Sequence, residues 1–396
     1  MSIACYRLSP WHPLSRFPGP VSARLTKWWM IYQIAVKGGR HVKLRELHAQ
    51  YGPWVRVGPN EISVNLPCAV RPIYNKLDRS PFYSAIPADA DTLITVLDRQ
   101  VHASRRQAWT KAVTSDAMQS YIPFLMARIT QLDRIFDRET SKGPVQIDHW
   151  INLFLMDLMG DMGFSGGFET MSAGKDTEGW MEMFAKKKVA EIKASTGNKT
   201  RRDILGTLLD ESSAIYRLNE AEAAADAALI VVAATDTTAQ TLAALVPYTM
   251  CDRNILSRLQ AEVGTAFVSY SGESENMDVS AVMRLPFLDA CIQEALRLVP
   301  PGPFGPPRTS GSVGVNISDV YIPPNTTIHV PVYTMHRDSA NFGPNADDYA
   351  PERWLEGSIC TINFEGKPKI IKEAFMPFSA GYASCVGKKL ALQNMK

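Results

Sequence analysis

The sequence predicts a mainly α-helical fold with a smaller β-rich region (α+β). From about residue 87 to residue 299, apolar side chains recur mostly at helical spacing. The stretch from Pro300 to Tyr333 is instead rich in Pro, Gly and β-branched residues, and Gly52 to Val64 alternates apolar with polar residues. No repeat or clean linker separates these parts. We therefore expect one domain over 1–396, with β-rich parts at about 52–66 and 301–335.

Helices are expected on both sides of the first β-rich part. Pro18-Gly19-Pro20 ends any earlier helix, and apolar residues follow at helical spacing up to Tyr51. The apolar stretch from Ala227 to Val246 carries polar residues at its centre, and a central Asp costs about 2.5–3.5 kcal/mol on membrane insertion scales. A buried helix is favoured there over a membrane span.

Charge and cysteine content exclude several classes of protein. Lys plus Arg (42) nearly equals Asp plus Glu (40), so the composition favours no nucleic-acid partner. The six cysteines are scattered without a C-x-x-C pair, which indicates a reducing compartment or a membrane surface facing one. The first 20 residues hold four prolines and no long apolar run, so no transmembrane anchor is expected in the chain.

Cys385 lies in the pattern F-x-x-G-x-x-x-C-x-G, formed with Phe378, Gly381 and Gly387. A helix is expected directly after it, and the positive end of a helix dipole keeps a thiolate charged. The glycines leave room for a flat cofactor, and Phe378 could keep water off the sulfur. The alternative is a buried structural cysteine. Residues 377–387 resemble the haem-binding loop of the cytochrome P450 family, whose cysteine is the axial ligand of the haem iron.

Two further motifs support this resemblance. Glu294 and Arg297 form the chain's E-x-x-R, and Arg353 lies in "PERW". Alone, a pair at this spacing is worth less than about 1 kcal/mol. The resemblance implies that these three residues form a buried charge network beside the haem, within a cytochrome P450-like fold.

"HRD" at His336 is similar to a kinase motif, but no Gly-rich loop or D-F-G accompanies it.

Asp236 and Thr237 lie in "AATDTT" on the long apolar helix. In one interpretation the hydroxyl groups of this segment only donate hydrogen bonds to carbonyls of the preceding turn. The resemblance implies instead that this helix crosses the distal face of the haem, where an alcohol, Thr237, and an acid, Asp236, relay protons. Ala234 stands where the family usually has glycine, which puts the local opening of that helix in question.

The haem propionates need cationic or N–H partners. The resemblance implies that His102 and Arg106, at i and i+4, and Arg308 in "PPRTS" serve this purpose, while solvated arginines are the alternative. The family usually has a further arginine or histidine two residues before the cysteine. Ala383 stands at that place, so Arg106 and Arg308 gain importance.

The resemblance is closest to fungal, membrane-associated members that tailor natural products. It implies a haem b monooxygenase that inserts one oxygen atom from O2 into a hydrophobic small molecule, with electrons from an NADPH-cytochrome P450 reductase. Lys388 and Lys389 could face that reductase or be ordinary surface lysines. The implied location is the cytosolic face of the endoplasmic reticulum, with the cytosol as the alternative for a chain without an anchor.

Some parts of the family's fold are expected to be missing. These are the anchor, part of the helices between about Phe168 and Arg202 that roof the substrate pocket, and the segment after the first turns of the helix that follows Cys385. Fewer than 40 residues lie where the family has two long helices. The alternative function is therefore a truncated, non-catalytic haem-binding or interaction protein. Substrate identity and the type of oxidation stay open.

Overall fold

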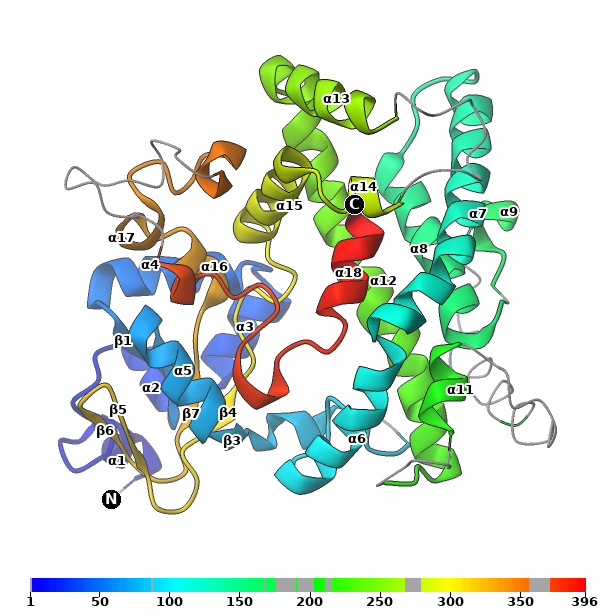
Figure 1. The fold of residues 1–396 in the computed structure, drawn as a ribbon. Helices are drawn as coiled ribbons and strands as arrows, with labels where there is room; N and C mark the ends of the chain where they lie inside the picture. The colour runs from blue at the N-terminus through cyan, green and yellow to red at the C-terminus, as the bar shows by residue number, and fades with distance from the viewer. Residues whose placement is uncertain are drawn as a thin grey trace. The chain divides into compact units, whose positions relative to one another are not determined.

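The structure is a computed structural model that describes residues 2–86, 89–166, 168–175, 190, 203–210, 216–267, 279–355 and 371–396. The chain divides into two compact units (Figure 1). Unit 1 comprises Met1–Ala85 and Gln293–Cys385, and unit 2 comprises Ile86–Ile292 and Val386–Lys396. The structure is mostly helical with small sheets, which confirms the predicted fold class. A single domain over 1–396 stays a prediction.

Unit 1 contains the β-structure (Figure 1). Its main sheet has the order β1-β2-β7-β4-β3, with β2 parallel to β7 and the other pairs antiparallel. A separate hairpin joins β5 and β6 through residues with positive φ at Ser318 and Asp319, as tight hairpin turns require. The strands are β1 (Trp54–Gly58), β2 (Glu61–Val64), β3 (Asp78–Arg79), β4 (Arg308–Thr309), β5 (Val315–Ile317), β6 (Val320–Ile322) and β7 (Thr327–His329).

Both predicted β-rich parts contain strands, but β3 was not predicted. It is two residues long, and its partner β4 lies more than 200 positions away, so no local pattern marks it. The helices of unit 1 are short because Pro and Gly interrupt them repeatedly. They are α1 (Ile3–Leu8), α2 (Val21–Leu25), α3 (Trp28–Ala35), α4 (Arg40–Tyr51), α5 (Pro67–Lys76), α16 (Val332–His336) and α17 (Ser339–Phe342).

The core of unit 1 connects the sheet to the segment that precedes Cys385. Ile62 and Val64 of β2 and Ile328 of β7 are fully buried, together with Ile73 and Tyr74 of α5. The same cluster includes Ala374 and Met376. Helix α5 also contacts the 3-10 turns η6 (Lys372–Ala374) and η7 (Gly381–Ala383). The cysteine segment therefore rests on a packed helix.

Unit 2 is built around α8 (Ile147–Phe164), which is buried on almost every side because most of its residues are apolar, and its two buried carboxylates, Asp157 and Asp161, form ion pairs with Arg128. Helix α12 (Glu220–Met250) lies beside it (Figure 1). The other helices are α6 (Arg99–Ala112), α7 (Ser115–Thr140), α9 (Thr170–Ala173), α11 (Ile204–Leu208), α13 (Arg253–Phe267), α14 (Val279–Val282), the start of α15 (Pro286–Leu298) and α18 (Lys388–Met395).

Within the described ranges, α12 is the one helix with the length and apolarity of a membrane span. It begins with a capping box between Asn219 and Glu222. Asp226 is fully buried in its first half and accepts hydrogen bonds from Arg105 and Trp109 of α6. A charged side chain that is satisfied inside unit 2 is typical of a core helix, and it agrees with the interpretation favoured from the sequence.

The predicted loss of roof helices between Phe168 and Arg202 lies mostly outside the described residues. Of that stretch, the structure describes residues 168–175, which contain α9, and residue 190.

Candidate functional site

The loop that ends at Cys385 is closed by backbone hydrogen bonds. The N–H of Cys385 donates to the carbonyl of Phe378 (2.9 Å), and the N–H of Ser384 donates to that of Gly381 (3.1 Å). Phe378 is half-buried, whereas Cys385 is exposed. An exposed cysteine argues against the structural alternative, because a thiol that serves packing alone is ordinarily buried.

Gly381 allows the loop to lie directly on α5. Its φ is +73°, and a Cβ there would come within 2.1 Å of the carbonyl oxygen of Tyr74. Any other residue would both clash and adopt an unfavourable backbone conformation. Gly387, by contrast, has an ordinary φ of −80° and is the residue before α18, which begins three positions after Cys385. The predicted helix after the cysteine is therefore present.

Arg308 in β4 is a buried cation close to this loop. Its side chain is 1% exposed, and its guanidinium lies 5.0 Å from the ring of Tyr74 and 5.7 Å from that of Tyr382. Nη1 donates to the carbonyl of Pro307, while Nε and Nη2 have no hydrogen-bond partner among the described residues. A buried guanidinium with unpartnered N–H groups requires an anion. A haem propionate would fit this need.

The predicted charge network is assembled around Glu294. Its carboxylate accepts hydrogen bonds from Nε and Nη2 of Arg297 (2.8 and 2.7 Å) and from Nε of Arg353 (3.3 Å). The Trp354 indole (2.9 Å) and the Ala350 N–H (3.0 Å) complete its coordination. All three charged side chains are fully buried. Burial opposes ionisation, but hydrogen bonds from Arg297 and the charges of both arginines lower the pKa of Glu294 below its usual value.

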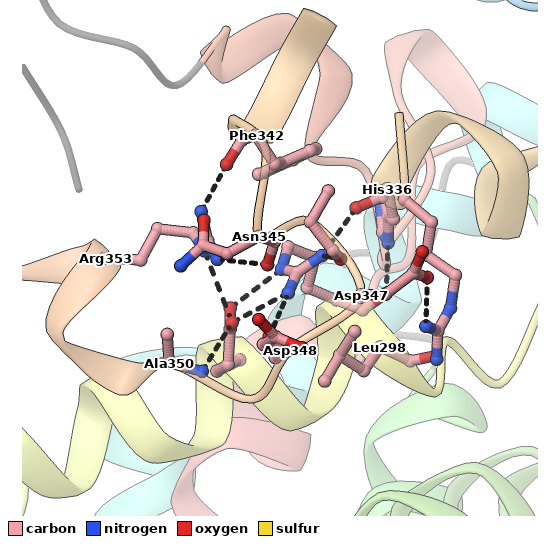
Figure 2. A network of polar contacts seen from close by, with 12 residues as sticks. Leu298, His336, Phe342, Asn345, Asp347, Asp348, Ala350 and Arg353 are labelled. Carbon is pink, nitrogen blue, oxygen red and sulfur yellow. Dashed lines mark hydrogen bonds and ion pairs between the residues drawn. The ribbon is translucent and has the colours of Figure 1, made fainter. Parts of the chain in front are cut away.

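The two arginines also hold the chain around them. Figure 2 shows Arg353 reaching the carbonyl oxygens of Phe342 and Asn345. Arg297 donates to the carbonyls of His336 (2.7 Å), Ala346 (2.5 Å) and Asp348 (3.0 Å). The guanidinium groups therefore tie α15 to the irregular segment between α16 and the "PERW" turn η4 (Pro351–Trp354).

His336 is a residue of this site that the sequence analysis did not assign. Its Nδ1 bonds to the carbonyl of Arg297 (3.0 Å), and its Nε2 accepts the N–H of Met376 (3.0 Å). The ring stacks on Phe375 at 5.3 Å. His336 therefore connects the charge network to the segment that leads to Cys385. The signal was present as "HRD", in the segment that leads into "PERW", but the sequence analysis assigned this histidine no role.

Buried neutral histidines make the stability of unit 1 depend on pH. Burial lowers the pKa of His336 to about 3 and that of His48 to about 4. Because these histidines have a pKa near 6.5 in the unfolded chain, they leave the free energy of unfolding unchanged above that pH and lower it as the pH falls. We expect each histidine to lower the free energy of unfolding by about 1.4 kcal/mol per pH unit between pH 6.5 and 5. Urea unfolding at pH 7.5, 6 and 5 measures this loss, and a flat profile would contradict it.

In unit 2, α6 carries His102 and Arg106. His102 is buried and Arg106 is half-buried. The neighbouring Arg105, which the sequence analysis did not assign, fixes this helix: it donates to Asp226 (2.8 Å) and Glu222 (3.3 Å) of α12. Burial raises the pKa of Asp226, while Arg105 acts in the opposite direction. The pair therefore sets the position of the two predicted propionate-binding residues relative to α12.

Asp236 and Thr237 are both exposed near the middle of α12. The hydroxyl of Thr237 donates to the carbonyl of Ala233 (2.7 Å), and Thr241 in turn donates to the carbonyl of Thr237 (3.0 Å). This is the local bonding that the sequence allowed as the simpler interpretation. The Thr237 hydroxyl oxygen can still accept a hydrogen bond from a neighbouring donor, and the relay stays a prediction.

Comparisons with known proteins agree with these features. A model of the family "Cytochrome P450" matches residues 172–396. The cytochrome P450 monooxygenase FCK2 of Fusarium pseudograminearum is 30% identical, and the alignment covers 100% of this chain and 76% of that protein. Cytochrome P450 67 of Uromyces fabae is 30% identical (100% and 80% covered), and tryprostatin B 6-hydroxylase of Aspergillus fumigatus is 29% identical (100% and 75%).

The chain belongs to the cytochrome P450 family, which confirms the resemblance inferred from its motifs. The alignment with the Fusarium protein has 438 positions, against 396 residues in this chain. That relative therefore contains residues within the aligned span that this chain lacks. An internal shortening of this kind was expected from the sequence.

Proposed function

We propose that this protein is a haem-thiolate monooxygenase that inserts one oxygen atom from O2 into a hydrophobic small molecule, a natural-product intermediate. The observation that carries the proposal is the exposed Cys385 in a backbone-closed loop beside the buried, incompletely partnered guanidinium of Arg308. A soft thiolate and a cation that lacks its anion are complementary to the iron and a propionate of haem b. Membership of the family supports the same cofactor.

Each residue has a definite task in this proposal. Cys385 would hold the iron, and Phe378 would limit the access of water to the sulfur. Arg308, His102 and Arg106 would hold the propionates. When bound, haem supplies the activation of oxygen, which side chains cannot perform themselves. Asp236 and Thr237 would relay protons through the carboxylate oxygens of Asp236 and the hydroxyl oxygen of Thr237.

The direct test is cofactor uptake by the purified chain. We expect it to bind hemin and, after reduction under carbon monoxide, to show the red-shifted Soret band of a thiolate ligand. Addition of NADPH and a cytochrome P450 reductase then measures oxygen-dependent conversion of hydrophobic test substrates. A colourless protein after supply of hemin would end the proposal.

A non-catalytic haem-binding or interaction protein is the second candidate. The observation that favours it is the shorter length of this chain within the span aligned to its relatives. Missing roof helices would leave the substrate side wet, and water there diverts reduced oxygen from the substrate. A thiolate-type spectrum without product, together with release of reduced oxygen, would favour this candidate.

We place the protein at the cytosolic face of the endoplasmic reticulum, in contact with the membrane and with an NADPH-dependent reductase. Helix α3 supports the membrane contact because apolar residues face solvent there: Trp28, Ile31, Tyr32, Ile34, Ala35 and Val36 are exposed. Lys27 and Lys37 flank it, and no Asp or Glu precedes Glu46. Exposed aromatic and basic side chains are typical of helices that lie in a membrane interface. Lys388 and Lys389 are exposed beyond Cys385 and could face the reductase.

This contact is measurable with vesicles. We expect the protein to co-sediment with vesicles that contain anionic phospholipid and to lose most of this binding when Trp28 and Ile31 are both replaced by serine, since burial of these side chains drives it. The control is Val313→Ser, because Val313 is also exposed but lies outside α3. Equal binding of all three proteins would exclude α3 as the contact.

A further inference from the structure

The chain lacks the basic residue that the family usually has two positions before the cysteine. Ala383 occupies that place, so the loop itself offers no cation before Cys385 from Pro377 onward. Arg308 is the buried cation that lies against the loop, through the ring of Tyr382. No carboxylate forms an ion pair with it in the described part of the chain. Its charge is therefore still to be compensated.

The rings of two tyrosines lie against this guanidinium, and Tyr83 is near enough for the charge of Arg308 to oppose the rise that burial causes in the pKa of Tyr83. Tyr74 of α5 is fully buried, and its hydroxyl accepts the N–H of Val330 at 3.4 Å, which fixes the ring against the end of β7. Tyr382 belongs to η7, three residues before Cys385. Both rings lie within cation–π distance of Arg308. Burial raises the pKa of Tyr74, so it stays a neutral phenol and cannot serve as the counter-ion.

We propose that Tyr382 is a positioning residue for cofactor binding: its ring, with that of Tyr74, orients Arg308 so that Nε and Nη2 are available to one propionate. In this way the loop contributes to propionate binding through Tyr382 and Arg308, although it lacks a cation of its own. The inference rests on the proposed function, because it requires that haem binds. It adds Tyr382 to the residues that serve that function and couples its ring to Arg308.

The test is a hemin titration of the apoprotein, followed by absorbance, with matched variants. Arg308→Gln should weaken hemin binding about tenfold, because charge-assisted hydrogen bonds are lost. Tyr382→Leu and Tyr382→Ala should weaken it about three- to fivefold, because the ring no longer holds the guanidinium. Tyr382→Phe keeps the ring and should bind hemin like the wild type. The double variant Arg308→Gln/Tyr382→Leu should bind no more weakly than Arg308→Gln alone.

A second probe, the dimethyl ester of hemin, separates this role from general packing. Its propionates carry no charge, so the wild type and Tyr382→Leu should bind it equally. A difference that persists with the ester, or additive losses in the double variant, would overturn the inference, and so would full hemin affinity of Tyr382→Leu. If these results came with a normal thiolate spectrum, the proposed function would stand. Absence of hemin binding in the wild type would remove both.

Discussion

Replacement of Cys385 by serine is expected to remove the red-shifted Soret band of the reduced, carbon monoxide-bound protein completely. The band requires a thiolate ligand to the iron, and a serine hydroxyl is neither soft nor ionised at neutral pH. The loop should keep its shape, because its hydrogen bonds to Phe378 and Gly381 come from the backbone. Monooxygenase turnover should disappear together with the band, since thiolate donation promotes O–O cleavage.

The matched control is Cys68→Ser. Cys68 is also exposed and belongs to the same unit, but it lies on α5 near Ser318, whose hydroxyl is 3.5 Å from its sulfur. We expect this variant to show the wild-type spectrum. An unchanged band in Cys385→Ser would show that the iron ligand lies elsewhere in the chain. An equal loss in Cys68→Ser would show that the loss of the band is not specific to Cys385.

Replacement of Glu294 by alanine is expected to destabilise unit 1 by about 3–5 kcal/mol, because two fully buried guanidinium groups lose their common counter-ion. The indole of Trp354 and the N–H of Ala350 also lose their acceptor. Glu294→Gln should be nearly as destabilising, since a neutral amide cannot balance Arg297 and Arg353. The measurement is the urea midpoint of the apoprotein, recorded at pH 7.5 where the carboxylate is ionised.

An exposed pair in the same unit provides the control. Glu373 lies 3.5 Å from Arg71, and their side chains are 44% and 76% exposed. Glu373→Gln should change stability by less than about 1 kcal/mol. Equal midpoints for the Glu294 and Glu373 variants would show that the buried network does not support the fold. Hemin binding by the Glu294 variants should fall as well, since Arg297 and His336 connect the network to Met376.

Several features of the site could be predicted because they lie within a few consecutive residues. The spacing of Phe378, Gly381, Cys385 and Gly387 is fixed by one loop, and Glu294 and Arg297 meet because they are three positions apart on one helix. The β-strands near residues 52–66 were predicted from alternation, which is typical of a half-buried strand, but the structure buries both faces of β1 and β2, Arg56 and Ser63 included. A two-residue strand such as β3 carries no such pattern.

Other features depend on pairs that are distant in the chain. Arg105 and Asp226 are 121 positions apart, and Val330 and Tyr74 are 256 apart. In the sequence Arg105 is one of two adjacent arginines, and nothing local indicates that it is buried while Arg106 is only partly so. His336 was visible as a motif, but its bond to Met376 depends on how the segment after η6 returns to α16.

The amino-acid sequence by itself determined the family, the mainly helical fold and the cysteine loop, because periodicity and short motifs act over a few residues. The tertiary structure decided which charges are compensated: Glu294 receives two arginines, whereas Arg308 lies between aromatic rings and keeps two N–H groups without a partner. Periodicity reports that a side chain is buried, but its partner is chosen by packing between segments that are remote in the chain.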